Sequence, residues 1–338
     1  MLAAVLLLSG CTSKANPASS VAGVKDTDAT STTTAETTII ETTKEPEPFT
    51  FNPHLHCSLL SEIVTEDMWG SLYNMIDAIR AGEDTFKCTD ENAYKWCTDD
   101  VTIGSFLPAA CTLVVGDGYE NGVGKLKYKV DKDKFLEREK AFEEEIVRII
   151  NEATKSDRSD FEKLMGLYDY MCKYWVYDYN ELDGQGIDDF SDYACLTKKD
   201  GICCEIAGAF SYLLLQCGVE ALKFTGGSGS SSHAWSYVTI DGAGYFIDPT
   251  WGISERGSRE LAYFMTTDSE RLFYFDKYMG PQIFYYDFKN KDVDFSASDD
   301  RYAPLHNGKA VSMNRKSKIL KYSVDGRIRE FHYDTQNE

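Results

Sequence analysis

Two adjacent cysteines, Cys203 and Cys204, lie where a polar loop gives way to an apolar segment with helical spacing. Stepping back three or four residues from Ile206 and Ala207 reaches Cys203, at the first turn of the expected helix and on its core-facing edge. The positive end of a helix favours the thiolate form of such a cysteine. Helical spacing alone leaves open whether Cys203 is a nucleophile or the first core residue.

A nucleophilic thiol needs a base and an orienting group. His233 is the best candidate for the base, because it opens an extended run and the two histidines of the tail lie far along the chain. The Gly/Ser-rich segment before it, residues 226–232, fits either a flexible connection or a mobile cleft wall. His54 and His56 alternate beside a cysteine, but this is a weak indication of zinc, so surface residues are the preferred interpretation.

The dipeptide Asp-Gly at positions 241–242 stands between two apolar segments and predicts a two-residue hairpin turn. If the residues flanking this turn pair with each other, Trp235 lies opposite Asp248. His233 then becomes a diagonal neighbour of Asp248 on one face, about 7–8 Å away at the backbone. A carboxylate at that place can fix the imidazole tautomer. The alternative for Asp248 is a strand-end cap before a proline.

Three motifs in this order resemble the signature of bacterial transglutaminase-like proteins. They are Gly201-Ile202-Cys203 followed by Ala207, then His233-Ala234-Trp235, then Asp248-Pro249-Thr250-Trp251. The likeness covers about residues 131–286 and includes Tyr263-Phe264-Met265, which resembles a strand of the family. It implies a papain-like fold with a Cys-His-Asp triad.

The resemblance assigns a role to each matching residue. Cys203 is the expected nucleophile, His233 the base and then the acid, and Asp248 the orienting carboxylate. By analogy with the fold, the backbone amide of Cys203 forms part of an oxyanion hole. Trp175, Tyr177 and Tyr179 are candidates for its second donor. Residues 204–206 depart from the Gln-Gly-Tyr often found in the family, which leaves the nucleophile in place and alters the rim of the site.

The amino-acid composition and net charge limit the kinds of molecule that the protein is expected to bind. The chain has 338 residues, of which 43% are hydrophobic, and a formal net charge of −20. Such a balance argues against nucleic acid and against electrostatic docking on anionic lipid. Neither a calcium loop nor a nucleotide motif is visible, so we expect no cofactor and no metal.

The first residues indicate export. Residues 2–8 are apolar but too short to span a bilayer, which suits a secretory signal. They end in Leu8-Ser9-Gly10-Cys11, which resembles a bacterial lipobox and makes Cys11 the expected lipidation site. The alternative is an ordinary signal peptide with a chance cysteine. We therefore expect an extracytoplasmic protein anchored to a bacterial membrane through lipid alone.

The remaining sequence predicts an α+β fold, with helices preceding an antiparallel sheet. The expected segments are a signal at 1–11, a disordered tether at 12–48, an accessory domain at 49–130, a papain-like, transglutaminase-like catalytic domain at 131–290 and a C-terminal extension at 291–338. Periodicity predicts helices at 59–81, 135–152, 161–174 and 200–216. Extended segments are expected at 101–115, 126–130, 233–240, 245–248 and 261–265, with turns at 116–118 and 325–326.

Export permits disulfides, and Cys88 with Cys97 is the bridge that proximity favours. Taken together, the sequence predicts a cysteine enzyme that transfers acyl groups from peptide or protein amides through a thioester, cell-wall peptides being among the expected substrates. Hydrolysis is slightly favoured over cross-linking. There are two alternatives: a binding module that keeps the fold without the chemistry, and a cell-wall structural protein held together by disulfides. The sequence leaves the oligomeric state open.

Overall fold

The computed structural model describes residues 47–154, 159–179, 191–228, 231–253, 259–272, 277–281 and 294–334. These residues belong to one compact unit. The signal segment, Cys11 and all but the last two residues of the tether lie outside the described residues. Within the described residues, no helix is both long and apolar enough to cross a membrane.

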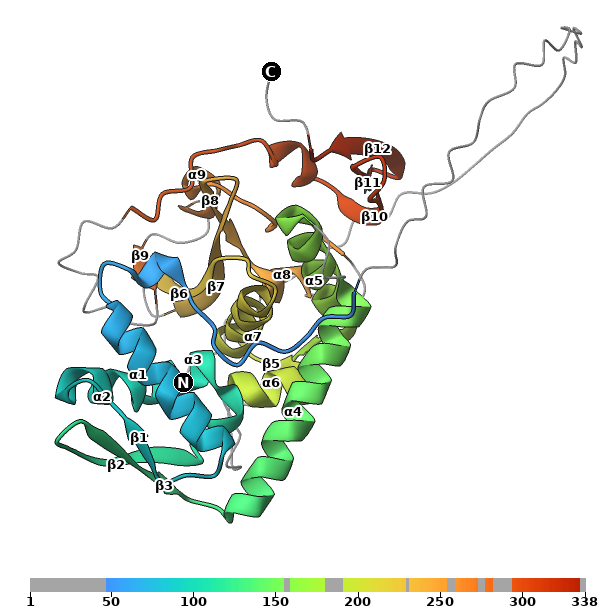
Figure 1. Ribbon diagram of the computed structural model, residues 1–338. Helices are drawn as coiled ribbons and strands as arrows, with labels where there is room; N and C mark the ends of the chain where they lie inside the picture. The colour runs from blue at the N-terminus through green and yellow to red at the C-terminus, as the bar shows by residue number, and fades with distance from the viewer. Residues whose placement is uncertain are drawn as a thin grey trace, which may run out of the picture. The chain divides into compact units, whose positions relative to one another are not determined.

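The N-terminal part of the unit combines short helices with a three-stranded antiparallel sheet of order β1-β3-β2 (Figure 1). Its elements are η1 (Ser58–Leu60), α1 (Glu66–Arg80), β1 (Thr85–Lys87), α2 (Glu91–Cys97), α3 (Asp100–Phe106), η2 (Pro108–Ala110), β2 (Val114–Glu120) and β3 (Val123–Tyr128). The helix expected from residue 59 begins only at Glu66, because the Thr65 hydroxyl accepts the Met68 N–H and caps it there.

Two further predictions for this part are wrong. Most of residues 101–115 is not extended: Asp99 caps α3 by accepting the Val101 N–H, and the apolar residues of that helix pack into the core at helical spacing. Only residues 114 and 115 are extended, as the start of β2. Residues 116–118 are not a turn but lie inside β2 at a register shift. The chain reverses instead at Asn121 and Gly122, both with positive φ, an Asn-Gly hairpin turn.

The central part contains the longest described helix, α4, and a four-stranded antiparallel sheet of order β8-β7-β6-β9. Its elements are α4 (Lys132–Ala153), α5 (Asp160–Tyr174), β4 (Val176–Tyr177), α6 (Asp192–Lys198), β5 (Asp200–Gly201), α7 (Cys203–Gln216), β6 (Ala221–Ser228), β7 (Ser231–Ile240), β8 (Ala243–Ile247), α8 (Pro249–Gly252), α9 (Asp268–Leu272) and β9 (Lys277–Pro281). The helices expected at 135–152 and 161–174 are confirmed as α4 and α5.

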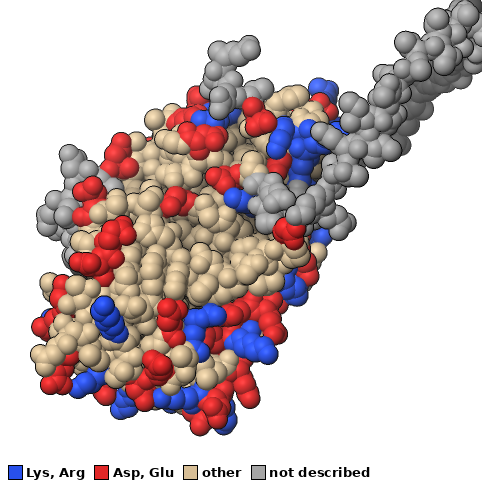
Figure 2. All heavy atoms as spheres, in the orientation of Figure 1, with Lys and Arg blue, Asp and Glu red and all other residues tan. Residues whose placement is uncertain are grey.

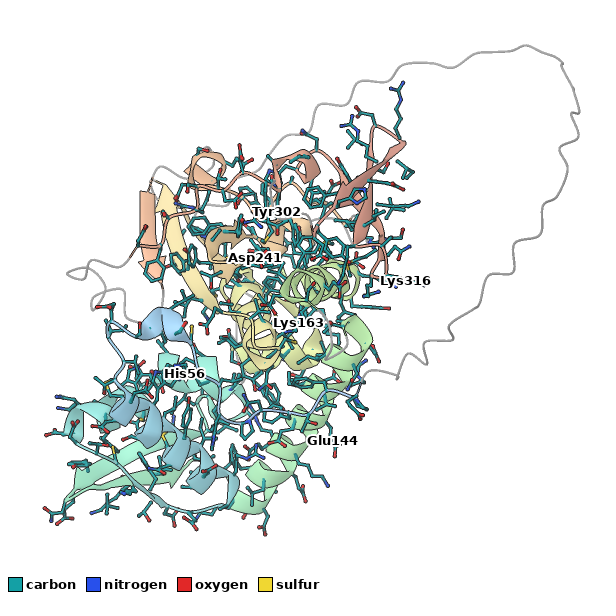
Figure 3. The ribbon with its side chains drawn as sticks, turned by 45° about the horizontal axis from the view of Figure 1, so that its top comes forward. His56, Glu144, Lys163, Asp241, Tyr302 and Lys316 are labelled. Carbon is teal, nitrogen blue, oxygen red and sulfur yellow. The ribbon has the colours of Figure 1, made fainter. Side chains whose placement is uncertain are left out.

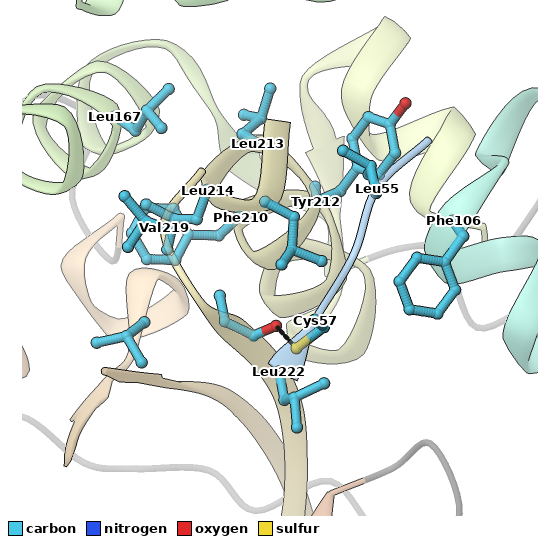
Figure 4. Packing of buried hydrophobic residues seen from close by; sticks show 14 of the residues in the cluster. Leu55, Cys57, Phe106, Leu167, Phe210, Tyr212, Leu213, Leu214, Val219 and Leu222 are labelled. Atoms are coloured by element: carbon cyan, nitrogen blue, oxygen red, sulfur yellow. Dashed lines mark hydrogen bonds between the residues drawn. The ribbon is translucent and has the colours of Figure 1, made fainter. Parts of the chain in front are cut away.

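Helix α7 is buried along almost its whole length and packs on β6 and β7. The hydroxyl of Ser236 in β7 contacts the Ser211 hydroxyl at 3.0 Å and donates to the Ala207 carbonyl at 3.2 Å. Leu55 and Cys57, from the N-terminal strap of residues 49–60, join Leu213 in the same apolar packing around the helix (Figure 4). Segments that are distant in the sequence therefore hold α7 in place.

The C-terminal part forms a third antiparallel sheet of order β10-β11-β12. Its elements are η4 (Ala303–Leu305), β10 (Lys309–Asn314), β11 (Ile319–Val324) and β12 (Arg327–His332). The turn predicted at residues 325–326 is confirmed, because Val324 pairs with Arg327 across it. The strand predicted at 261–265 is wrong: the segment is a series of turns and bends between two isolated bridges, at Glu260 and Thr266.

The described elements confirm the α+β class, with antiparallel sheets that follow helices. One hydrophobic cluster contains residues from Leu55 to Val324 and joins all three parts. The division at residues 130 and 290 stays a prediction.

Candidate active site

Cys203 is the first residue of α7, and the backbone before it is held by Glu205. The Glu205 carboxylate, which is 2% exposed, accepts the N–H of Ile202 at 2.9 Å. Gly201 has a φ of +157°, and a Cβ there would lie 2.9 Å from this carboxylate. The helix starts three residues later than predicted, because residues 200 and 201 pair with β4 instead. Glu205, one of the residues that departs from the family motif, therefore fixes the start of the helix.

His233 and Asp248 meet as the hairpin register predicts. Ile240 pairs with Ala243 and Ser236 with Ile247, so the Asp241-Gly242 turn is confirmed. His233 Nε2 lies 2.6 Å from Asp248 Oδ2, and both side chains are buried. The Gly/Ser-rich segment is not an open loop, because Gly226 pairs with His233 and the strands continue to Ser228 and Ser231. Residues 229–230 lie outside the described residues.

The surroundings of His233 stabilise its charged form. Burial by itself lowers the pKa of the imidazole, but the charge and hydrogen bond of Asp248, with a hydrogen bond to Cys203, raise that pKa to about 10 from its ordinary 6.5. The ring therefore contacts both the Asp248 carboxylate and the Cys203 side chain. Such an arrangement keeps a protonated imidazole beside the nucleophile candidate.

Asp248 both contacts His233 and caps the following helix, the two roles between which the sequence did not decide. Its Oδ2 contacts His233, while its Oδ1 accepts the N–H of Trp251 at 3.2 Å and so caps α8. The Trp251 ring stacks on His233, with ring centroids 5.3 Å apart and planes inclined by 29°. The cap restrains the Asp248 side chain, and the stacked Trp251 ring restrains the His233 imidazole. Trp251 belongs to the motif quoted above, but its contact with His233 depends on the turn after β8.

Cys204 lies in different surroundings from Cys203. Burial raises the pKa of its thiol to about 12, partly opposed by Lys223. Lys223 forms a buried ion pair with Asp192, with a nitrogen–oxygen distance of 3.2 Å. Cys204 is therefore a protonated thiol on the flank of α7 at neutral pH, as its position on the helix predicts.

The three candidates for a second oxyanion donor lie in different places. Trp175 is fully buried, with the Lys199 ammonium 5.5 Å from its ring centroid. Tyr177 pairs with Gly201 across the parallel strands β4 and β5, next to the start of α7. Tyr179 is 75% exposed. Position thus favours Tyr177, and the role itself stays a prediction.

A cavity of about 430 Å³ adjoins the His233–Asp248 pair. Its wall includes Asp248, Trp235, Trp251 and Tyr263 from the triad side, with Arg271 of α9. His306 closes another part of the wall and contacts Glu270 at 2.7 Å. The cavity can hold a substrate side chain beside the triad.

The structure describes no group of three or more His, Cys, Asp or Glu side chains arranged to hold a metal ion. His54 contacts Asp77 at 2.8 Å, and His56 contacts Tyr73 at 3.2 Å. The nine cysteines of the described residues, Cys88 and Cys97 among them, are free thiols, so the predicted bridge is wrong. His332 belongs to β12, far along the chain from the triad.

Comparison with known families gives the same assignment for the central segment. Residues 147–248 match the family model of the transglutaminase-like superfamily. The chain carries a transglutaminase-like domain. The match spans Cys203, His233 and Asp248. No significant match was found among curated proteins.

Two solved structures resemble this chain at low sequence identity. One is the crystal structure of a TGase, with 17% identity, a TM-score of 0.29 and coverage of 48% of each chain. Another is a "Putative Cysteine Protease from Cytophaga hutchinsonii", with 14% identity, a TM-score of 0.23 and coverage of 40% of this chain and 61% of that one. This chain thus spans about half the length of the TGase structure.

Proposed function

We propose that this protein is an extracytoplasmic cysteine enzyme that transfers acyl groups from peptide or protein amides through a thioester. The observation that carries the proposal is that His233 contacts both the Asp248 carboxylate, at 2.6 Å, and the Cys203 thiol. The transglutaminase-like domain at residues 147–248 supports the same chemistry.

The geometry supplies both halves of an acyl transfer. The Cys203 thiolate attacks the amide carbonyl carbon, and the C–N bond breaks as the His233 imidazolium gives its proton to the departing amine. An acyl thioester and a neutral imidazole remain. Water or a primary amine then adds to the thioester and loses a proton to His233, and the C–S bond breaks to return the thiolate. Water yields a carboxylic acid and an amine yields a new amide.

Hydrolysis is the favoured outcome, because water is always present in an open cleft, whereas an amine acceptor must be bound there. Transamidation, and therefore cross-linking, uses the same three residues and differs only in the acceptor. A surface module that keeps the fold without the chemistry has no need of a buried His233–Asp248 pair beside a thiol.

The proposed location outside the cytoplasm depends on the lipobox-like sequence at Leu8 to Cys11. A tether of the expected composition would hold the catalytic unit away from the membrane. Peptides and proteins of the cell envelope would then be the substrates within reach.

An acid-quench experiment tests the chemistry. The protein is incubated with wall-derived peptides and with protein substrates, quenched in acid and digested for mass spectrometry. We expect an acyl group on the peptide that contains Cys203, none in Cys203→Ser, and most of the adduct retained in Cys204→Ser. A labelled primary amine in the same reaction separates hydrolysis from transamidation. Substrate binding without any adduct or product would support the binding module instead.

A further inference from the structure

The C-terminal sheet concentrates positive charge in a chain whose net charge is −20. Residues 309–332, which contain β10, β11 and β12, include seven basic residues and only two acidic ones, Asp325 and Glu330. The basic residues are Lys309, Arg315, Lys316, Lys318, Lys321, Arg327 and Arg329. In Figure 2, blue side chains gather at the upper right, where Figure 1 places this sheet. The net charge of the whole chain therefore conceals a positive patch.

Some of these charges are neutralised locally and others are not. Three lysines have carboxylate partners: Lys309 with Glu260 at 2.6 Å, Lys318 with Glu162 at 3.2 Å and Lys321 with Glu330 at 3.1 Å. Within the described part of the chain, no carboxylate lies within ion-pair distance of Arg315, Lys316, Arg327 or Arg329. Figure 3 shows Lys316 at the outer end of the sheet.

A cavity of about 500 Å³ lies where this sheet meets α5, lined by residues other than the triad. Three cations line it from three segments, Lys173 of α5, Arg259, and Arg315 of the β10–β11 turn, together with the carboxylates of Asp169 and of Glu152, which pairs with Arg148 at 2.6 Å. The Nε of Arg315 is buried and has no hydrogen-bond partner among the described residues. Arg259 pairs with Asp169, whereas Lys173 has no carboxylate partner in the described residues. Buried N–H donors of this kind need an acceptor.

We infer that this cavity and the adjoining sheet bind a flexible, linear polyanion whose repeating unit carries phosphate. Guanidinium groups match phosphate oxygens by paired hydrogen bonds. Arg327 pairs with Val324 at the far end of β11, about 17–20 Å from the cations of the β10–β11 turn, the length of a six-residue strand, and Arg329 pairs with Tyr322 about midway. A single phosphate cannot reach both ends, whereas a polymer can.

The shape and chemistry of the site distinguish this ligand from two others. A planar bilayer cannot follow the wall into the cavity to reach Arg315. A nucleic acid would need exposed aromatic faces for its bases. The wall offers one exposed aromatic side chain, Tyr174 at 44%, and its ring already packs against Tyr170, with centroids 4.5 Å apart, and lies under the Lys173 ammonium at 4.9 Å.

Binding of fluorescein-labelled inorganic polyphosphate to the full chain, followed by anisotropy at several salt concentrations, tests the inference. We expect Arg315→Gln with Lys173→Gln to weaken binding about tenfold and to reduce the slope of log K against log salt by about 1.4, or 0.7 for each lost contact. The matched control, Lys95→Gln with Lys87→Gln, removes the same charge from α2 and β1 and should change binding less than twofold. Circular dichroism and melting curves verify that each variant folds.

Four results would overturn the inference. Equal losses in the two double variants would mean that only net charge matters. If polyphosphate did not bind even at low salt, the proposed site would be ruled out. If orthophosphate displaced the labelled polymer as effectively, per phosphate group, as unlabelled polyphosphate does, the cavity would be a site for small anions only. Tighter binding to oligothymidylate, or to vesicles of phosphatidylglycerol and phosphatidylcholine, would assign the patch to a different partner.

Discussion

At the scale of single residues, the two neighbouring cysteines differ in what surrounds them. Cys203 contacts His233, whereas burial raises the pKa of Cys204 to about 12. Near neutral pH, iodoacetamide should therefore label Cys203 much faster than Cys204, as peptide mapping can measure. His233→Ala should slow the labelling of Cys203 and leave Cys204 unaffected. If the label were found chiefly on Cys204, the assignment of Cys203 as the nucleophile would be wrong.

The pKa of His233 predicts how activity depends on pH. In the folded protein it lies at about 10, above the ordinary 6.5, so the imidazolium contribution to stability is complete below about 6.5 and is lost as the pH rises through 10. The alkaline limit of kcat/KM should fall in the same upper range.

Asp248→Asn tests the origin of this shift. Without the carboxylate charge, burial dominates and lowers the pKa of His233, so the alkaline limit should move down by at least about 2 pH units. Turnover should fall by two or more orders of magnitude, roughly as in other triads that lose this charge. Asp241→Asn, an exposed substitution on the same hairpin, is the control and should leave the profile unchanged. If the alkaline limit of kcat/KM did not move in Asp248→Asn, the His233–Asp248 pair would not be what sets that limit.

At the scale of elements, helix α4 carries a buried acid with a pH-dependent effect. Burial raises the pKa of Glu139 to about 7, partly opposed by Arg80. The folded chain thus keeps a proton that the unfolded chain has released between about pH 4.5 and 7, so this group reduces the free energy of unfolding as the pH rises through that window.

Glu139→Gln should remove this effect. At pH 8 the variant should be more stable than the wild type by about 1–3 kcal/mol in urea denaturation, while at pH 4.5 the two should nearly coincide. Arg80 keeps its contact with Glu143 in the variant. Glu144→Gln, on the exposed side of the same helix (Figure 3), should change stability little at either pH. A parallel loss at every pH would show that the carboxylate stabilises the fold.

At the scale of the whole molecule, the N-terminal strap and the central helix share one core. Asn52 exchanges two hydrogen bonds with Gln216, at 3.1 and 3.0 Å, and the Cys57 thiol contacts the Ala221 carbonyl at 3.7 Å. Leu55 is 1% exposed in the same cluster as α7. The segment 49–130 should therefore unfold together with the catalytic segment.

Leu55→Ala tests this coupling. We expect a single thermal transition in the wild type and in the variant, with a loss of about 2–5 kcal/mol from the cavity left in the core. His54→Ala, beside it on the partly exposed strap, should cost less than about 0.5 kcal/mol. Two calorimetric transitions, with only one of them shifted, would mean that the segments fold independently.

The anchoring prediction also belongs to the whole chain. In a bacterium that processes lipoproteins, the wild type should fractionate with membranes and incorporate labelled fatty acid, whereas Cys11→Ser should lack the label. The chain expressed from residue 49 onward lacks Cys11 and should also take up no labelled fatty acid. Failure of the wild type to take up fatty acid would exclude the lipidation site.

Local sequence determined the features whose cause is local. The Asp241-Gly242 turn fixes the β7–β8 register, and the register brings His233 to Asp248, because side chains in a strand alternate with a period of two. Amphipathic spacing likewise determined α4 and α5. In each case the neighbouring residues alone select the conformation.

Tertiary structure decided the features that depend on distant partners. Residues 100–106 form a helix whose Ile103 and Phe106 are buried in the shared core, although the segment resembles a strand. The raised pKa of His233 needs the Asp248 charge and the Cys203 sulfur to outweigh the effect of burial, and the hairpin register predicts only the contact with Asp248. The polyanion cavity needs α5 and the C-terminal sheet in contact, about 140 residues apart in the chain. Desolvation and charge proximity exist only once the chain has folded.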